Sequence, residues 1–112
     1  MVLKKENTKV YIHREPTGGK DKAGNPVFEE IVVEVSYRIP TAPEGESLLV
    51  DQVKDTAIFK KYVQTVKSND IEGWADGIAP GDVTALPGTL GLIHSVALDI
   101  MADMRLGFVR KN

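Results

Sequence analysis

The sequence predicts an α+β fold, in which an N-terminal antiparallel β-hairpin packs on two main C-terminal amphipathic helices with short helical turns between them. Apolar and polar residues alternate within residues 9–39, whereas apolar residues recur at helical spacing within residues 47–108. The chain has 112 residues, 42% of them apolar and 27% charged, which suits one globular domain with a modest core. We therefore expect residues 1–112 to form a single domain.

The strongest strand signal runs from Phe28 to Ile39. Its expected partner is a short strand over residues 9–14, across a loop of residues 15–26. Glycine and proline are dense in this loop, which predicts a mobile connection with a tight turn at residues 21–24. Pro40 ends the second strand because proline cannot donate to a ladder. The face expected to pack on a core carries Ile31, Val33, Val35, Tyr37 and Ile39.

The helical part is expected to begin at Ser47, which is a suitable N-cap. Apolar residues then follow a helical stripe as far as Lys67. The second half of this segment, residues 55–67, has the clearer helical pattern. Residues 48–53 fit a short strand equally well.

A connector rich in Asp, Gly and Pro separates the two main helices. Within it, Ile71, Trp74 and Ile78 recur at helical spacing and predict a short helical turn. A second turn is expected from Asp82 to Leu86. The last helix is expected to follow Thr89 as its N-cap and to end at Gly107. Its apolar stripe consists of Leu90, Ile93, Ala97, Ile100, Met101, Met104 and Phe108.

Two glycine-containing motifs in the hairpin loop fail as binding sites for phosphate or calcium. Gly18-Gly19-Lys20 lacks the first glycine of a phosphate loop, and Asp21 stands where that loop has Ser or Thr. Asp21 with Asn25 lacks the other ligands of a calcium loop. Both motifs are better explained as turns.

No catalytic, cofactor-binding or metal-binding constellation emerges from the rest of the chain. There are no cysteines, and the serines lack a flanking signature of an activated nucleophile. His94, Asp99 and Asp103 share the last helix, where a solvated helix face is the simpler interpretation. We therefore expect no enzymatic activity, no metal and no cofactor.

Charge and hydropathy bear on partners and location. The net charge is −2 and the basic residues are scattered, so no nucleic-acid interface is expected. No apolar run approaches the roughly 20 residues that span a bilayer, so no membrane association is expected. The N-terminus lacks the apolar region of a signal peptide, and the cytoplasm is the expected location.

Another polypeptide is the expected partner, because two helical stripes and one sheet face compete for burial in a small domain. Apolar surface would remain for self-association or for a partner helix. Large aromatic and methionine side chains are the candidates for such contacts, with the core as the alternative for each. The candidate partner-binding residues are Phe59, Tyr62, Trp74, Met101 and Met104.

Short pieces of residues 35–112 together form a recognisable pattern. They are Tyr37-Arg38-Ile39-Pro40, Phe59-Lys60-Lys61-Tyr62-Val63, Ile71-Glu72-Gly73-Trp74, Leu86-Pro87-Gly88, and a final helix followed by Arg110-Lys111-Asn112. In these pieces the chain resembles the tail assembly chaperones of long-tailed, siphovirus-type bacteriophages. The chain departs from the commonest members in its glycine-rich loop and in Ala75-Asp76 after the tryptophan.

The resemblance implies a non-enzymatic protein of the infected bacterial cytoplasm. It would bind the tape measure protein, keep it soluble and help the tail tube protein to assemble around it. No functional residue is carried over, because no motif defines the binding surface of the family. A structural phage protein, either a tail completion or a head–tail joining component, is the alternative.

Overall fold

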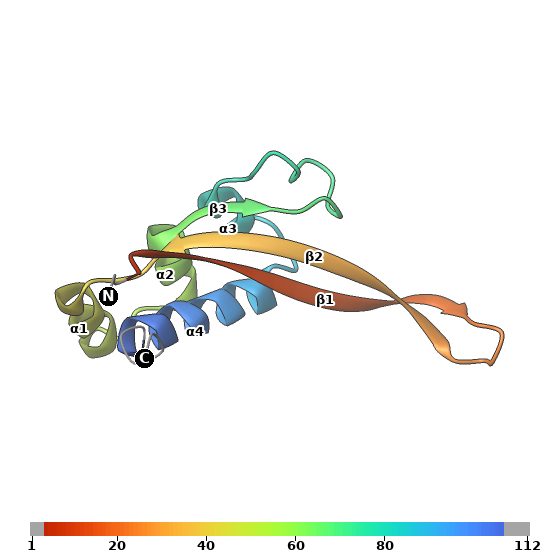
Figure 1. Ribbon diagram of the computed structural model, residues 1–112, viewed down its shortest axis with the longest axis horizontal. Coiled ribbons are helices and arrows are strands. Elements are labelled where there is room, and N and C mark those ends of the chain that lie inside the picture. Colours follow the sequence, from red (N-terminus) through yellow and green to blue (C-terminus); the bar gives the residue numbers. More distant parts are fainter. Residues whose placement is uncertain (1–3, 107–112) are drawn as a thin grey trace.

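The computed structural model describes residues 4–106 and confirms the α+β fold, with a three-stranded antiparallel sheet and helices beside it (Figure 1). The molecule is elongated, measuring 54 × 34 × 27 Å, because the hairpin projects beyond the helices. In chain order the elements are β1 (Glu6–Lys20), β2 (Pro26–Arg38), α1 (Ala42–Val50), α2 (Asp55–Tyr62), β3 (Val63–Lys67), α3 (Pro80–Thr84) and α4 (Leu90–Leu106).

The hairpin is longer than the sequence predicts. β1 and β2 pair without interruption from Glu6 opposite Arg38 to Pro16 opposite Phe28. The loop predicted over residues 15–26 is therefore wrong for most of its length, since only residues 21–25 form the turn. Its proline and glycines are tolerated because β1 is an edge strand and the register shifts between Pro16 and Lys20.

The predicted tight turn itself is confirmed. Gly24 N donates to Asp21 O at 3.0 Å, and Gly24 has a φ of +82°, which favours glycine. The Asp21 carboxylate accepts from the backbone N–H groups of Ala23 and Asn25, both at 2.9 Å. An aspartate that bonds the following backbone in this way closes a turn without outside support.

The core lies between one face of the sheet and the helices. The inner face of β2 is the predicted one, and Val33, Val35 and Tyr37 are buried there. α4 runs beside the proximal part of the hairpin, with α2 packed on α4 (Figure 1). The other buried apolar residues are Leu48, Ile58, Phe59, Tyr62, Val63, Val66, Trp74, Val83, Ile93, Val96, Ala97 and Ile100.

The segment predicted as the first main helix is divided into three elements. α1 begins at Ala42, capped by Thr41 in a capping box with Glu44, so the prediction of Ser47 as N-cap is wrong. The strand alternative for residues 48–53 is also wrong. The chain reverses at Gln52, whose φ is +50°, before α2 begins.

β3 replaces the predicted end of that helix. Residues Val63–Lys67 pair antiparallel with Glu34–Tyr37 of β2, so the helix assignment for this stretch is wrong. Val63 and Val66 are buried, and β-branched residues pack well on a sheet. Helical and strand patterns both fit so short an apolar run, and the free edge of β2 decides between them.

The connector and the last helix partly match the prediction. Ile71 and Trp74 begin two consecutive turns, closed by Trp74 N to Ile71 O and Gly77 N to Trp74 O, and Ile78 forms a β-bridge with Val66, so no helix forms there. α3 starts at Pro80, before the predicted Asp82. α4 begins at Leu90 as predicted. Gly107, where this helix was expected to end, lies outside the described residues.

A charged cluster fixes α1 to the end of β2. The Arg38 guanidinium donates to both Glu44 carboxylate oxygens, at 2.7 and 2.9 Å. These bonds and those from Thr41 hold the pKa of Glu44 well below its usual range. Tyr62 OH donates to Glu44 at 3.2 Å, and the Arg38 guanidinium lies 4.8 Å from the Tyr62 ring centroid. Helices α1 and α2 are thus both tied to the strand.

Candidate partner-binding groove

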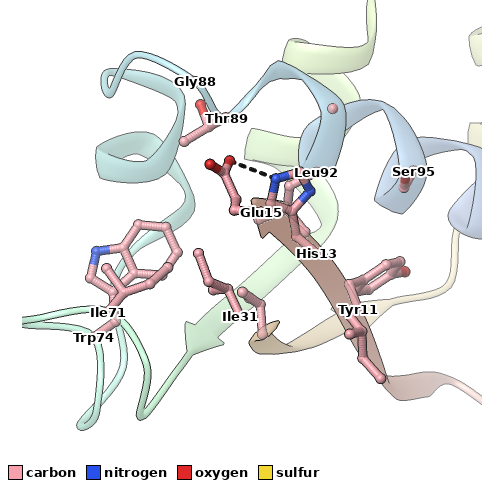
Figure 2. A pocket seen from close by; sticks show the side chains of 13 residues that line it. Tyr11, His13, Glu15, Ile31, Ile71, Trp74, Gly88, Thr89, Leu92 and Ser95 are labelled. Carbon is pink, nitrogen blue, oxygen red and sulfur yellow. Dashed lines mark hydrogen bonds and ion pairs between the residues drawn. The ribbon is translucent and has the colours of Figure 1, made fainter. Parts of the chain in front are cut away.

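An apolar groove of about 360 Å³ lies where the hairpin leaves the helices (Figure 2). Its wall on one side is β1, and its wall on the other side is the connector after β3 together with the start of α4. The residues around it include Tyr11, His13, Glu15, Ile31, Val33, Ile71, Trp74, Gly88, Thr89, Gly91, Leu92 and Ser95.

Trp74 and Ile71 reach the groove because the connector folds back on the sheet. Ser68 N donates to Trp74 O at 3.1 Å, and Val66 and Ile78 exchange backbone hydrogen bonds. This pairing holds the tryptophan backbone beside the end of β3. The Trp74 side chain is 6% exposed, so it supports the groove from within the core.

The position of α4 beneath β1 depends on a polar network behind the groove. Tyr11 OH donates to Asp99 at 2.6 Å, and Tyr37 OH donates to the buried Asp103. Lys9 Nζ lies 3.7 Å from Asp99 and 3.6 Å from Asp103. Each carboxylate of α4 thus meets donors from the hairpin, which fixes the helix relative to the strands.

Burial raises the pKa of both tyrosines in this network. For Tyr11 and for Tyr37, loss of hydration is the largest cause, and the hydrogen bond to Asp99 or Asp103 is the next. A phenolate beside a carboxylate would leave two negative charges adjacent, so both hydroxyl groups remain protonated donors at neutral pH.

The rim of the groove is polar and exposed. His13 and Glu15 project from β1 and bond each other at 2.7 Å, as the dashed line in Figure 2 shows. Gly91 lies on the opposite side, in the first turn of α4. A Cβ at this position would meet no heavy atom within 4 Å, so the space beside Gly91 is open.

The groove is suited to apolar side chains better than to a polar small molecule. The Tyr11 hydroxyl is bonded to Asp99, and the Thr89 hydroxyl donates to two backbone carbonyls. The Glu15 carboxylate is bonded to His13. Small-molecule sites usually combine an apolar wall with converging free polar groups. Within residues 4–106, no group of three His, Cys, Asp or Glu side chains is placed to hold a metal ion.

The five residues singled out from the sequence do not form one surface. Trp74 lines the groove, whereas Phe59 and Tyr62 are buried at 0% and 1% exposure. Tyr62 also borders a second hollow of about 370 Å³ between α1 and α2. Met101 and Met104 are half-buried toward the other end of α4, where the Met104 thioether lies against Gly45 of α1. A partner-binding role for these five stays a prediction.

Sequence reasoning missed Tyr11 and Leu92 as groove residues and misread two aspartates. Asp99 and Asp103 were expected on a solvated face, but Asp103 is 4% exposed and both bond the hairpin. The available signal was their spacing of four residues, which places both on one side of α4. His94 is exposed as expected and bonds Asp55 of α2.

Comparison with known proteins adds no relative. No protein-family model matches the chain, and no significant match was found among curated proteins or solved structures. No helix within residues 4–106 is both long enough and apolar enough to cross a membrane.

Proposed function

We propose that this protein is a tail assembly chaperone of a long-tailed bacteriophage that binds the tape measure protein. It acts without catalysis in the cytoplasm of the infected bacterium, where it keeps the tape measure protein soluble and helps the tail tube protein to assemble around it. The resemblance in residues 35–112 supplies the family, and the groove supplies a surface for the client.

The observation that carries the proposal is the apolar groove beside the start of α4. Ile31, Ile71 and Leu92 are half-buried on its walls. The Tyr11 hydroxyl and the Glu15 carboxylate beside them are already bonded to other side chains. An amphipathic client helix could place apolar side chains in such a groove while its polar face stays in water. The tape measure protein is a long helical polypeptide in this family, which fits that mode of recognition.

Gly91→Leu tests the groove directly. The new side chain enters the open space beside α4, so it should obstruct the client without displacing the core. We expect the affinity for the tape measure protein of the same phage to fall at least about tenfold, or about 1.4 kcal/mol. Isothermal titration calorimetry with a soluble tape measure fragment measures this change.

Gly81→Leu is the matched control. Gly81 also lies in a helix, has open space beside it and does not line the groove. The affinity of the Gly81→Leu variant for the client should equal that of the unchanged protein. Wild-type affinity in Gly91→Leu would place the client elsewhere on the surface. Failure of the unchanged protein either to bind the tape measure protein or to prevent its precipitation would contradict the chaperone function itself.

The projecting hairpin favours a second candidate, a structural component of the virion. A long strand pair that extends beyond its helices can join neighbouring subunits in a ring. Mass spectrometry of purified virions distinguishes the two functions. Stoichiometric amounts in the virion would support a tail completion or head–tail joining protein, whereas absence supports the chaperone.

A further inference from the structure

β1 has a free edge along its length within the described part of the chain. The strand order β1-β2-β3 places β2 on one side of β1, and no described strand lies on the other. The other edge of β2 differs, because side chains that follow β3 bond its backbone beyond the end of β3. Asp70 accepts from Val32 N at 2.8 Å, and Ser68 donates to Val32 O at 2.7 Å. A free edge with unpaired N–H and C=O groups is a template for another strand.

The hairpin ladder shows which residues face that free edge. Lys5 O accepts from Ile39 N at 2.8 Å, which continues the register in which Glu6 lies opposite Arg38. Alternate residues of a strand point their backbone groups to opposite sides. The odd-numbered residues of β1 therefore bond β2, and the even-numbered ones present their N–H and C=O groups outward. Among these outward groups, the Thr8 N–H donates to the Asn7 side-chain oxygen at 2.9 Å and would have to exchange that bond for one to a second strand. Pro16 belongs to the outward set, so its missing N–H costs the hairpin no bond.

We propose that a second copy of this chain pairs with β1, antiparallel, about a two-fold axis through Val10. The two sheets then form one continuous sheet across a symmetric dimer. This inference does not rest on the chaperone function, because it is argued from the backbone groups and charges of the β1 edge. Ile12 and Glu15 of that edge also line the groove.

Charge complementarity fixes both the occupant and the register. With Val10 opposite its own copy, Arg14 lies opposite Glu6 of the second copy, and Lys5 lies opposite Glu15. Symmetry repeats both pairs. All four side chains are exposed in the single chain. Three of them have exposed partners there, since Glu6 accepts from Gln64 at 3.1 Å, Glu15 bonds His13 and Arg14 bonds Glu30, and the pairs across the dimer would add to or replace these contacts. Opposite charges directly across from each other stabilise a strand pair.

Neighbouring registers lack this complementarity. An axis through Lys9 would place Lys9 opposite its own copy and Glu6 opposite Ile12. An axis through Tyr11 would place Glu6 opposite Pro16 and Glu15 opposite Asn7. Each of these two shifts removes both attractive pairs, so the charges favour the register centred on Val10 over its two neighbours.

The same register covers apolar surface. Val10 and Ile12 are 57% and 62% exposed on the outer face of the sheet. In the dimer Val10 meets Val10, and Ile12 meets Thr8 of the second copy. Arg14 already bonds Glu30 through Nε and Nη2, which leaves its remaining N–H donors for Glu6.

Sedimentation velocity over a concentration series reaching on the order of 100 μM tests the dimer, with Val10→Pro as the disrupting variant. The Val10 N–H faces away from β2, so proline should spare the hairpin while removing a central bond of the interface. We expect at least about a 100-fold rise in the dimer dissociation constant, and no such rise for Val10→Thr, which keeps the N–H.

Charge reversal tests the register without altering the backbone. Lys5→Glu alone places like charges opposite Glu15 twice, and should weaken the dimer about tenfold. Lys5→Glu combined with Glu15→Lys restores opposite pairs, and should return the dissociation constant to within about twofold of the original. This pair of measurements remains decisive if Val10→Pro fails to fold.

Three results would overturn the proposal. The first is a monomer throughout the concentration series. This result would also be found if the β1 edge pairs with the tape measure protein and not with a second copy. The second is a dimer that Val10→Pro, still folded by circular dichroism, leaves unchanged. The third is a double charge reversal that is no tighter than Lys5→Glu alone.

Discussion

The two ends of the hairpin share a ladder but differ in what covers them. Near the helices, Val33, Val35 and Tyr37 of β2 are buried at 5% exposure or less. Toward the turn, Val27 and Phe28 of the same strand are 39% and 51% exposed. Figure 1 shows this distal part extending beyond the helices and β3. The alternation of residues along β2 sets which face is apolar, and the length of the helical layer sets how much of that face is buried.

The difference implies two levels of stability in one pair of strands. The proximal part is supported by the core and by the bonds from Tyr11 and Tyr37 to α4. The distal part relies on cross-strand bonds and on exposed pairs such as Arg14 with Glu30, at 3.0 Å. A two-stranded ribbon alone is marginal in water. We therefore expect the distal part to open locally without unfolding the rest.

The largest expected effect is a difference in the free energy of unfolding between two variants, each of which truncates one phenylalanine, in the core or in the distal hairpin. Phe59→Ala removes a fully buried ring and should lower the free energy of unfolding by about 3–5 kcal/mol. Phe28→Ala removes a half-exposed ring and should lower it by about 0.5 kcal/mol or less. Urea denaturation followed by circular dichroism measures both values. Similar losses for the two variants would mean that the distal hairpin is part of the cooperative core.

A smaller effect is expected at the network that joins the hairpin to α4. Tyr37→Phe leaves the buried Asp103 carboxylate without one donor and should cost about 1.5–3 kcal/mol. Tyr11→Phe should cost less, because the Asp99 side chain is 35% exposed and can be hydrated. The same denaturation measurement applies. If Tyr11→Phe lowered the free energy of unfolding as much as Tyr37→Phe or more, the bond to the buried Asp103 would not be the stronger of the two.

The network also predicts a pH dependence. The raised pKa values of Tyr11 and Tyr37 mean that the folded protein keeps phenolic protons that the unfolded chain releases above its ordinary value of 10.0. The free energy of unfolding is therefore unaffected by these groups below pH 10. Above it, the free energy falls by about 1.4 kcal/mol per pH unit for each tyrosine. Tyr37→Phe should make this fall less steep in alkaline denaturation, and an unchanged slope would count against the assignment.

The fold could be predicted where local pattern and tertiary packing agree. The inner face of β2, the turn at Asp21 and the start of α4 at Leu90 follow from alternation, turn chemistry and helical spacing. β3 was missed because its short apolar run fits either a helix or a strand, and its pairing with β2 is a tertiary choice. The length of the hairpin was missed because glycine and proline read as loop residues, although edge strands tolerate them.

The candidate site was less predictable than the fold. Trp74 was identified from its size, but the groove beside it requires β1, the connector and α4 to meet, and no local motif encodes that meeting. The role of Asp103 depends on Tyr37, which lies 66 residues away in the sequence. A polar residue that is buried by such a distant partner carries no signal in its own neighbourhood.

The central proposal is that the groove binds a polypeptide client. Hydrogen exchange of the protein, alone and with the tape measure protein proposed as that client, tests it most directly. In the free protein, amides near residues 15–28 should exchange faster than those of β3 and α4, as the comparison of the two hairpin ends predicts. On addition of the client, exchange should slow around Trp74 and in the first turns of α4. Unchanged exchange at both places in a mixture that forms a complex would contradict the account.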